Sequence, residues 1–271
     1  MNESSSIRWR AFGAALLLYL VWTTATYLLE GRIYTLLRPE ATLDRLTYAV
    51  VANLLIGIGG ATALLRWLLR RGVLTRKEIG FRRWRRTLAS LGAGLVLGLI
   101  LYAVQTSPIW HPMVILNGFA QVLVVSAAEV LVCWAAVGGT CYVALRPYGP
   151  RVALTGAALV AGGLFGVYHL AHSPPFNSLD MILLLSGVGL GTSAFYFAAR
   201  EVYGTVLFHN LMGLYGVTAS LYEIDRLRAF MQIQWSLLAM GAVTIALLVA
   251  ADRFGIASDR PPVAVDEPPP Q

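Results

Sequence analysis

The chain has 271 residues, of which 57% are hydrophobic and 13% are charged. An average soluble domain carries about 25% charged residues, so this composition excludes an ordinary soluble globule. The apolar residues fall into runs of about twenty, the length that crosses a hydrocarbon core roughly 30 Å thick. Because no stretch alternates apolar and polar residues as a transmembrane β-strand does, the sequence predicts an all-α, polytopic transmembrane helical bundle.

Apolar runs between helix breakers predict about eight membrane spans. In chain order we expect them at residues 11–29, 46–69, 88–105, 113–136, 152–172, 178–199, 202–221 and 232–251. We interpret residues 1–257 as one membrane-embedded domain. Residues 258–271 contain five prolines together with charged residues, a composition typical of a disordered tail.

The net charge of +7 comes from 21 Lys and Arg against 14 Asp and Glu, and the excess is concentrated in the loop at 66–86. A basic loop between apolar spans indicates a cytoplasmic topology anchor that touches anionic lipid headgroups, so we expect membrane lipids as partners and no nucleic acid. Basic residues also precede the first span and lie between the fourth and fifth spans, which places both termini in the cytoplasm. The excess of Arg over Lys favours a prokaryotic cell membrane.

Ionisable side chains are costly inside a membrane, so those within the predicted spans are candidates for function. They are Glu129 in the fourth span, His169 and His172 in the fifth, and His209 in the seventh. The spacing of 40 residues from Glu129 to His169, and again from His169 to His209, places these three groups on different helices. A carboxylate with imidazoles supports general-base activation of water, metal ligation or proton relay, and the residues alone leave all three open.

Each candidate also has a purely structural interpretation. A single histidine in a span is commonly a packing residue that donates a hydrogen bond to a neighbouring helix. His172 lies three residues after His169, on the same side of a helix, but it stands just before Pro174, where it could serve only to cap the helix end. Neither the His-Glu-x-x-His spacing nor a Cys-x-x-Cys pair occurs, so the standard zinc signatures are absent.

At these residues the sequence resembles the CPBP family of intramembrane proteases, the CAAX-protease and Abi group. That family has a Glu-Glu-x-x-x-Arg motif in one span, Phe-x-x-x-His in the next and His-x-x-x-Asn two spans later, within an eight-span core. Phe165 and His169 match the second motif fully. Glu129 and His209 stand where the first and third motifs would fall, and the resemblance covers residues 113–222.

Two motifs depart from the family pattern. If Glu129 is the first Glu, then Val130 and Trp134 occupy the places of the second Glu and the Arg; in the other register Ala128 and Cys133 replace the first Glu and the Arg. We prefer the first register because it keeps the only span carboxylate as the residue that activates water. In the third motif Gly213 replaces Asn, while Asn210 directly follows His209 and points about 100° away from it on an ideal helix.

The resemblance implies hydrolysis of a peptide bond in a membrane-anchored or lipidated protein substrate. Glu129, assisted by His169, would take a proton from water, and His209 would stabilise the oxyanion with Asn210 or a backbone amide as the second donor. The resemblance does not firmly imply a cofactor. We favour a metal-independent glutamate mechanism, since no second carboxylate is visible in the spans to orient histidine ligands. The alternative is a divalent metal such as zinc, held by Glu129, His169 and His209.

Other function classes stay open. The altered motifs are compatible with a catalytically inactive relative that acts as a scaffold or immunity factor. Proton-coupled transport is another alternative, although the sequence has no internal repeat of the kind common in transporters. A thiol enzyme using Cys133 is the least favoured alternative, because no basic residue is near it in the sequence. One difficulty is geometric: counted along the helices, His169 falls near the outer end of its span and His209 nearer the inner end.

Overall fold

A computed structural model describes residues 3–105 and 109–256 of the chain, and within these ranges the regular elements are all helices. The α-helices are α1 (Glu3–Thr26), α2 (Thr42–Tyr48), α3 (Ala61–Arg70), α4 (Arg76–Ile79), α5 (Trp84–Ala103), α6 (Pro112–Glu129), α7 (Gly139–Leu145), α8 (Pro150–Tyr168), α9 (Leu179–Ala199), α10 (Val202–Glu223) and α11 (Trp235–Ala250). The wider turns of π-helix extend them at Tyr27–Gly31, Ala49–Gly60, Val130–Gly138 and Ala251–Ile256, and short 3₁₀ turns occur at Arg146–Tyr148, His169–Ala171 and Leu227–Met231. The predicted tail at 258–271 lies outside the described residues.

Within the described residues, seven helices are long and apolar enough to cross a membrane, which makes the chain a multi-pass membrane protein. They cover Ser5–Gly31, Thr42–Arg70, Arg76–Ala103, Pro112–Tyr148, Pro150–Ala171, Leu179–Ala199 and Trp235–Ile256. The seventh predicted span, 202–221, is helical as expected, as α10, but it is not among these seven helices. Polar residues such as His209 and Asn210 lower its hydropathy.

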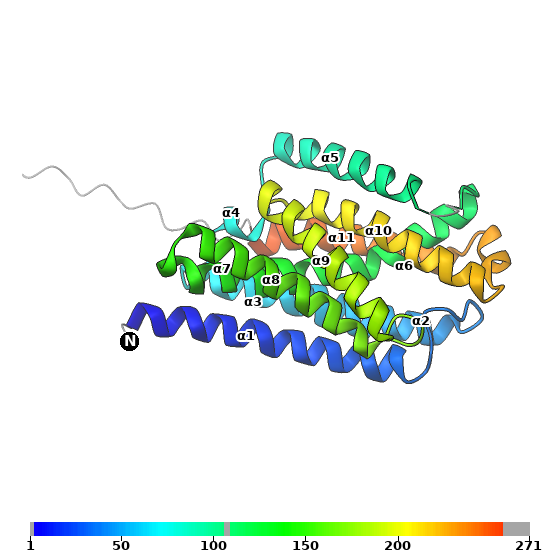
Figure 1. The fold of residues 1–271 in the computed structure, drawn as a ribbon, viewed down its shortest axis with the longest axis horizontal. Coiled ribbons are helices and arrows are strands. Elements are labelled where there is room, and N and C mark those ends of the chain that lie inside the picture. Colours follow the sequence, from blue (N-terminus) through cyan, green and yellow to red (C-terminus); the bar gives the residue numbers. More distant parts are fainter. Residues whose placement is uncertain (1–2, 106–108, 257–271) are drawn as a thin grey trace, which may run out of the picture.

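The fourth of these helices is the centre of the bundle. The sequence predicts a span at 113–136, but α6, the π-helical segment Val130–Gly138 and α7 form one continuous helix whose residues are almost all buried. A helix that is apolar on every side is stable only when other elements surround it. In Figure 1, α1, α8, α10 and α11 run along this central helix, and each of them contacts one of its three segments.

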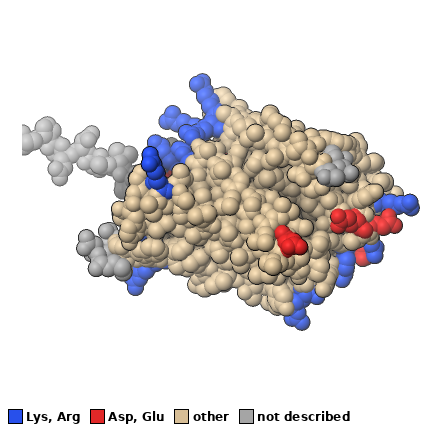
Figure 2. Space-filling model, viewed as in Figure 1, with Lys and Arg blue, Asp and Glu red and all other residues tan. Residues whose placement is uncertain are grey.

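Charge gathers at the two ends of the bundle, and the face shown in Figure 2 is almost free of charge between them. Arg8, Arg71 and Arg146 line one surface hollow, so the three basic clusters of the sequence lie at the same end of the molecule. This is consistent with the expectation that they share one side of the membrane, which stays a prediction. Which compartment that side faces stays a prediction.

Close backbone contact lets α8 and α9 pack side by side. A Cβ atom built on Gly162 would lie 2.9 Å from the backbone of Gly189 and Leu190, and one built on Gly189 would lie 2.6 Å from the carbonyl oxygen of Gly162. These atoms belong to backbone, which cannot turn aside as a flexible side chain can. Small residues at such crossings let membrane helices approach closely, so this pair fixes how near α9 comes to the residues at the end of α8.

We expect Gly162→Ala and Gly189→Ala each to destabilise the protein by about 1–3 kcal/mol, the usual cost of overpacking a close contact. Gly163→Ala and Gly187→Ala are matched controls on the same two helices, since a Cβ atom there meets nothing within 4 Å. The controls should be neutral or slightly stabilising, because Ala favours helix over Gly by roughly 1 kcal/mol. Thermal unfolding in detergent checks this, and equal stability of all four variants would contradict the assigned crossing.

Candidate functional site

The site is built around a hydrogen bond between the central helix and α10. Glu129 is the last residue of α6, where the helix widens into the π-helical segment, and His209 lies in α10. His209 Nε2 lies 2.9 Å from Glu129 Oε2, and both residues are buried, with 3% and 5% of their surface exposed. Turns of π-helix occur frequently at functional sites, where they re-aim side chains. The structure therefore joins two of the residues that the sequence singled out.

The hydrogen-bond partner of His209 Nδ1 determines how many protons His209 and Glu129 share. Thr192 in α9 donates its single hydroxyl proton to the carbonyl oxygen of Val188, at 3.0 Å. Its oxygen therefore accepts a hydrogen bond from His209 Nδ1, 2.9 Å away, so Nδ1 carries a proton. A hydrogen bond between Nε2 and Glu129 Oε2 needs one further proton, held either by His209 or by Glu129. One proton is therefore shared between His209 Nε2 and Glu129 Oε2, in addition to the proton on Nδ1. Glu129 Oε1 takes no part in that bond.

Phe165 explains why the Phe-x-x-x-His spacing matters here. Its ring centre is 4.8 Å from those of both His169 and His209, and it meets both rings edge to face. His169 begins the 3₁₀ turn after α8, and its Nδ1 donates to the Phe165 carbonyl oxygen at 2.9 Å. Its Nε2 has no hydrogen-bond partner in the part of the chain that the structure describes. A neutral His169 therefore offers an acceptor at Nε2.

Trp134 packs on the other side of His209. It occupies the place of the motif Arg in the preferred register, and its ring centre lies 5.1 Å from that of His209. Its indole N–H donates to Ser193 Oγ at 2.9 Å, so this buried ring has its one donor satisfied. Packing from Phe165 and Trp134 holds the imidazole of His209 in the orientation that faces Glu129.

A second carboxylate and histidine pair adjoins the first, which the sequence analysis did not expect. Glu30 follows the first predicted span directly and was placed in a loop, yet it is completely buried. Ser173 donates to it from its hydroxyl at 2.5 Å and from its backbone N–H at 2.8 Å. His172 Nδ1 lies 3.2 Å from Glu30 Oε2, and its ring stacks on that of His169 with centres 5.1 Å apart.

The expectation that the spans hold no second carboxylate is therefore wrong. Glu30 lies in the π-helical turn Tyr27–Gly31, which prolongs the first membrane helix beyond the predicted end at residue 29. Its partner Ser173 is 143 residues away in the chain. The position of the acid after a long apolar run was the only signal in the sequence, and it could not separate a buried helix end from a loop.

The four candidate residues line one cavity. Glu129, His169, His172 and His209 share it with apolar residues of α6, α9 and α10, and it has about 100 Å³ of space for the centres of water-sized molecules. A buried water needs only roughly 10–15 Å³ on this measure, so several can enter. Ser126 also lines the cavity, one turn before Glu129, and its buried hydroxyl has no hydrogen-bond partner in the described chain.

The expected difference in depth between His169 and His209 is not found. The turn between α9 and α10 does not reach the end of the bundle, because Glu201 is completely buried and the backbone N–H of Val202 donates to Gly80 O at 2.9 Å. Helix α10 therefore begins inside the molecule, whereas α8 begins at the exposed Pro150. This offset brings His209 level with the far end of α8.

Asn210 is not brought into the group. Its side-chain N–H donates to the carbonyl oxygen of Phe119 in α6 at 3.2 Å, and it does not line the cavity. Gly213, where the family motif has Asn, does line it. Residues four apart share a helix face and adjacent ones do not, so the expected role of Asn210 as oxyanion donor does not fit its position.

The arrangement does not fit the three-ligand metal site considered above. Both ring nitrogens of His209 already have hydrogen-bond partners, Glu129 and Thr192, so a metal could bind this histidine only by displacing one of them. Over residues 3–105 and 109–256, no group of three or more His, Cys, Asp or Glu side chains is placed to hold a metal ion. We therefore assign no chemical step to a metal.

Comparisons with known proteins identify no relative: no family model, curated protein or solved structure matches the chain. The resemblance to the CPBP family accordingly rests on the motif residues and stays a prediction. Any function proposed for the protein therefore rests on the geometry of the site.

We expect Glu30→Gln to destabilise the protein strongly. Removing one partner from a buried, charged hydrogen-bond network costs about 3–5 kcal/mol. Glu40→Gln is the matched control: Glu40 pairs with Arg226 at 3.6 Å, and both side chains are more than half exposed. Such surface pairs contribute at most about 1 kcal/mol. Thermal unfolding in detergent compares the two, and equal stability would show that Glu30 is not tied into the buried network.

Proposed function

We propose that the protein is an intramembrane endopeptidase in which Glu129 activates water. The observation that carries the proposal is the buried Glu129–His209 hydrogen bond at the wall of a cavity with room for water, with His169 facing the same cavity. A carboxylate held by an imidazole and open to water is the arrangement that general-base hydrolysis requires. The resemblance to a protease family, which rests on these same residues in the sequence, points to the same reaction.

The proposed reaction begins when Glu129 Oε1 takes a proton from a water molecule that His169 Nε2 helps to orient. The water oxygen forms a bond to the scissile carbonyl carbon, and the carbonyl oxygen becomes an oxyanion. When the C–N bond breaks, Glu129 returns the proton to the leaving amine nitrogen. The products are one carboxyl group and one amine, and no further reactant is needed.

Two positions differ from the roles implied by the family. His209 stays hydrogen-bonded to Glu129, so we assign it to holding the carboxylate and sharing its proton. Ser126 replaces Asn210 as the proposed oxyanion donor, because its unpartnered hydroxyl lines the cavity and Asn210 does not. Preorganised hydrogen-bond donors in a water-poor site stabilise developing charge most effectively.

The walls of the cavity indicate the class of substrate. Apart from the polar residues already named, it is lined by apolar side chains such as Val122, Leu185 and Val188. An extended segment of a membrane-anchored or lipidated protein could enter such a space with little loss of solvation. We therefore propose a substrate of that class and a site within the membrane.

Proton-coupled transport is the second candidate, favoured by one observation. His169 stacks on His172, which pairs with Glu30, and both histidines line the cavity that Glu129 and His209 also line, so that only this cavity separates the two carboxylate–histidine pairs. Chains of Asp, Glu and His serve as proton relays in membrane pumps. A proton flux into vesicles containing the purified protein, lost in Glu30→Gln under conditions where thermal unfolding shows that variant to be folded, would favour this candidate over hydrolysis.

For the protease, we expect Glu129→Gln to lower the rate of cleavage by about 10²–10⁴-fold, the usual contribution of a general base. The purified protein is placed in vesicles with a library of palmitoylated peptides of random sequence, in water enriched in ¹⁸O. Mass spectrometry then counts products with ¹⁸O in a new C-terminal carboxyl group. His169→Ala should also reduce the yield of labelled product.

Cys133→Ala is the matched control, since Cys133 is buried one turn after Glu129 in the central helix. It should cleave like the wild type, and its failure would favour the thiol alternative. Undiminished cleavage by Glu129→Gln would contradict the proposed base. If the wild type yields no labelled product in this library, the proposal of an active peptidase gives way to the inactive relative, as the altered motifs would allow.

We further expect cleavage to survive removal of divalent metals. Because both nitrogens of His209 are engaged, the wild type should keep its full rate after dialysis against EDTA and 1,10-phenanthroline. Elemental analysis of the dialysed protein supplies the control. A rate that falls after dialysis and returns with zinc would mean that the side chains rearrange around a metal during catalysis.

A further inference from the structure

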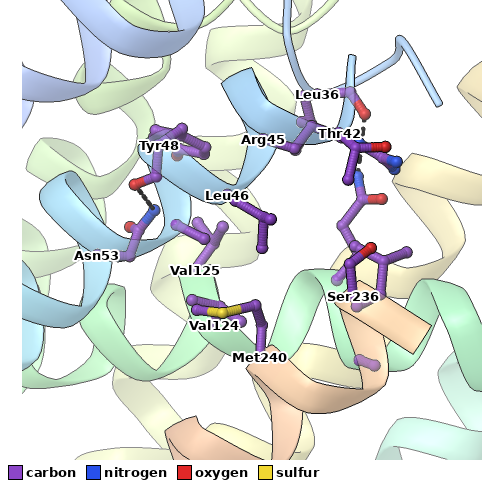
Figure 3. Close-up of a pocket in the computed structure, with 14 residues that line it drawn as sticks. Leu36, Thr42, Arg45, Leu46, Tyr48, Asn53, Val124, Val125, Ser236 and Met240 are labelled. Carbon is purple, nitrogen blue, oxygen red and sulfur yellow. Dashed lines mark hydrogen bonds between the residues drawn. The ribbon is translucent and has the colours of Figure 1, made fainter. Parts of the chain in front are cut away.

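A second cavity lies beside the candidate site, on a neighbouring face of α6. It is bounded by α2, the π-helical segment Ala49–Gly60, α6 and α11 (Figure 3), and its walls are mainly apolar. Leu46, Val124 and Met240 face one another across it in Figure 3, whereas Arg45 and Thr42 lie together near Leu36. The cavity is therefore apolar along most of its length, with a cation at one end.

Arg45 lacks a counterion in this position. It is only 6% exposed, and its one hydrogen bond runs from Nη2 to the carbonyl oxygen of Pro39 at 2.5 Å. Its Nε and Nη1 atoms are buried with no partner among the described residues. A buried guanidinium without an anion is costly, because its lost hydration is not replaced.

The nearby acids are already engaged with other arginines. Asp44 pairs with Arg38 at 3.0 Å, and Glu40 pairs with Arg226 at 3.6 Å. No ion pair of Arg45 occurs in the described part of the chain. Glu40 also acts on Arg45 electrostatically but forms no ion pair with it, so the cavity presents one positive charge without a direct counterion, which favours a ligand with net negative charge.

Gln121 adds a second unfilled polar group at the same cavity. Its N–H donates to the carbonyl oxygen of Leu36 at 3.0 Å, while its Oε1 is buried without a partner. That oxygen can accept a hydrogen bond from a ligand hydroxyl. Unpartnered buried groups of this kind are rare in native structures and require an explanation.

From these observations we infer that the mouth of this narrow cavity, which has about 30 Å³ of space for the centres of water-sized molecules, binds the phosphate of an anionic membrane phospholipid at Arg45, while an acyl chain lies along Leu46, Leu237 and Met240. Arg suits phosphate because its planar fork of N–H groups matches two oxygens at once. A glycerol headgroup, as in phosphatidylglycerol, would also supply a hydroxyl to Gln121 Oε1. Because Val125 and Leu36 line this cavity and the candidate site alike, the lipid would border the site without entering it.

Native mass spectrometry of the whole protein in nanodiscs tests this inference. Discs of phosphatidylcholine that contain a small share of phosphatidylglycerol should release wild-type protein with phosphatidylglycerol retained. Arg45→Met should weaken this binding about tenfold or more, because charge-assisted hydrogen bonds are lost. Arg32→Gln, which removes an exposed charge at the same end, should leave it unchanged.

A second pair of variants keeps the test valid if Arg45→Met does not fold. Met240→Trp fills the apolar part of the cavity and leaves the cation in place, so it should also abolish retention. Val243→Trp is its control, because Val243 is 43% exposed on the outer face of α11. Retention of phosphatidylglycerol by both Arg45→Met and Met240→Trp would overturn the inference.

Three further probes distinguish the class of ligand. Phosphatidylcholine should bind more weakly than phosphatidylglycerol, and equal binding would overturn the requirement for net negative charge. Inorganic phosphate alone should not stabilise the protein against heat, whereas phosphatidylglycerol should raise the unfolding temperature of the wild type. Oleate bound as tightly as phosphatidylglycerol would overturn the assignment to a phospholipid and favour a fatty acid.

Discussion

The hydrogen bond between Glu129 and His209 crosses the most apolar part of the molecule, and much of the structure follows from the need to satisfy it. A carboxylate placed among apolar helices loses its hydration, so it is tolerated only where neighbouring groups donate to it or share a proton with it. His209 does so from α10, and Thr192 satisfies the other ring nitrogen from α9. Two helices, α9 and α10, must therefore keep a fixed distance and rotation relative to the central one.

Small residues and aromatic rings make that arrangement possible by different means. The contact between Gly162 and Gly189 brings the backbones of α8 and α9 together, which no larger side chain would allow. Phe165 and Trp134 then fill the space beside His209 and prevent its ring from turning. Close packing in the bundle thus positions the polar groups, and the polar groups in turn tie the helices to one another.

The central helix borders two neighbouring cavities of different chemistry. In one, acids and histidines face a space with room for water, as hydrolysis requires. In the other, an unpaired cation ends an apolar space, as a lipid anion requires. Both depend on one property of α6, which presents Glu129 and Ser126 on one face and Gln121 on another. Occupation of the second cavity would therefore stabilise the helix that carries the proposed base.

The sequence by itself determined the class of fold and most of its elements. Runs of apolar residues predicted membrane helices because a bilayer demands their length, and the scarcity of charge singled out Glu129 and the three histidines. It did not reveal that Glu30 is buried, that the fourth span continues to residue 148 or that Arg45 forms no ion pair. Those facts depend on partners far apart in the chain, such as Ser173 for Glu30, and on the buried start of α10. Tertiary structure decided them, because depth and rotation in a bundle are set by contacts between helices, while hydropathy records only that each helix is apolar.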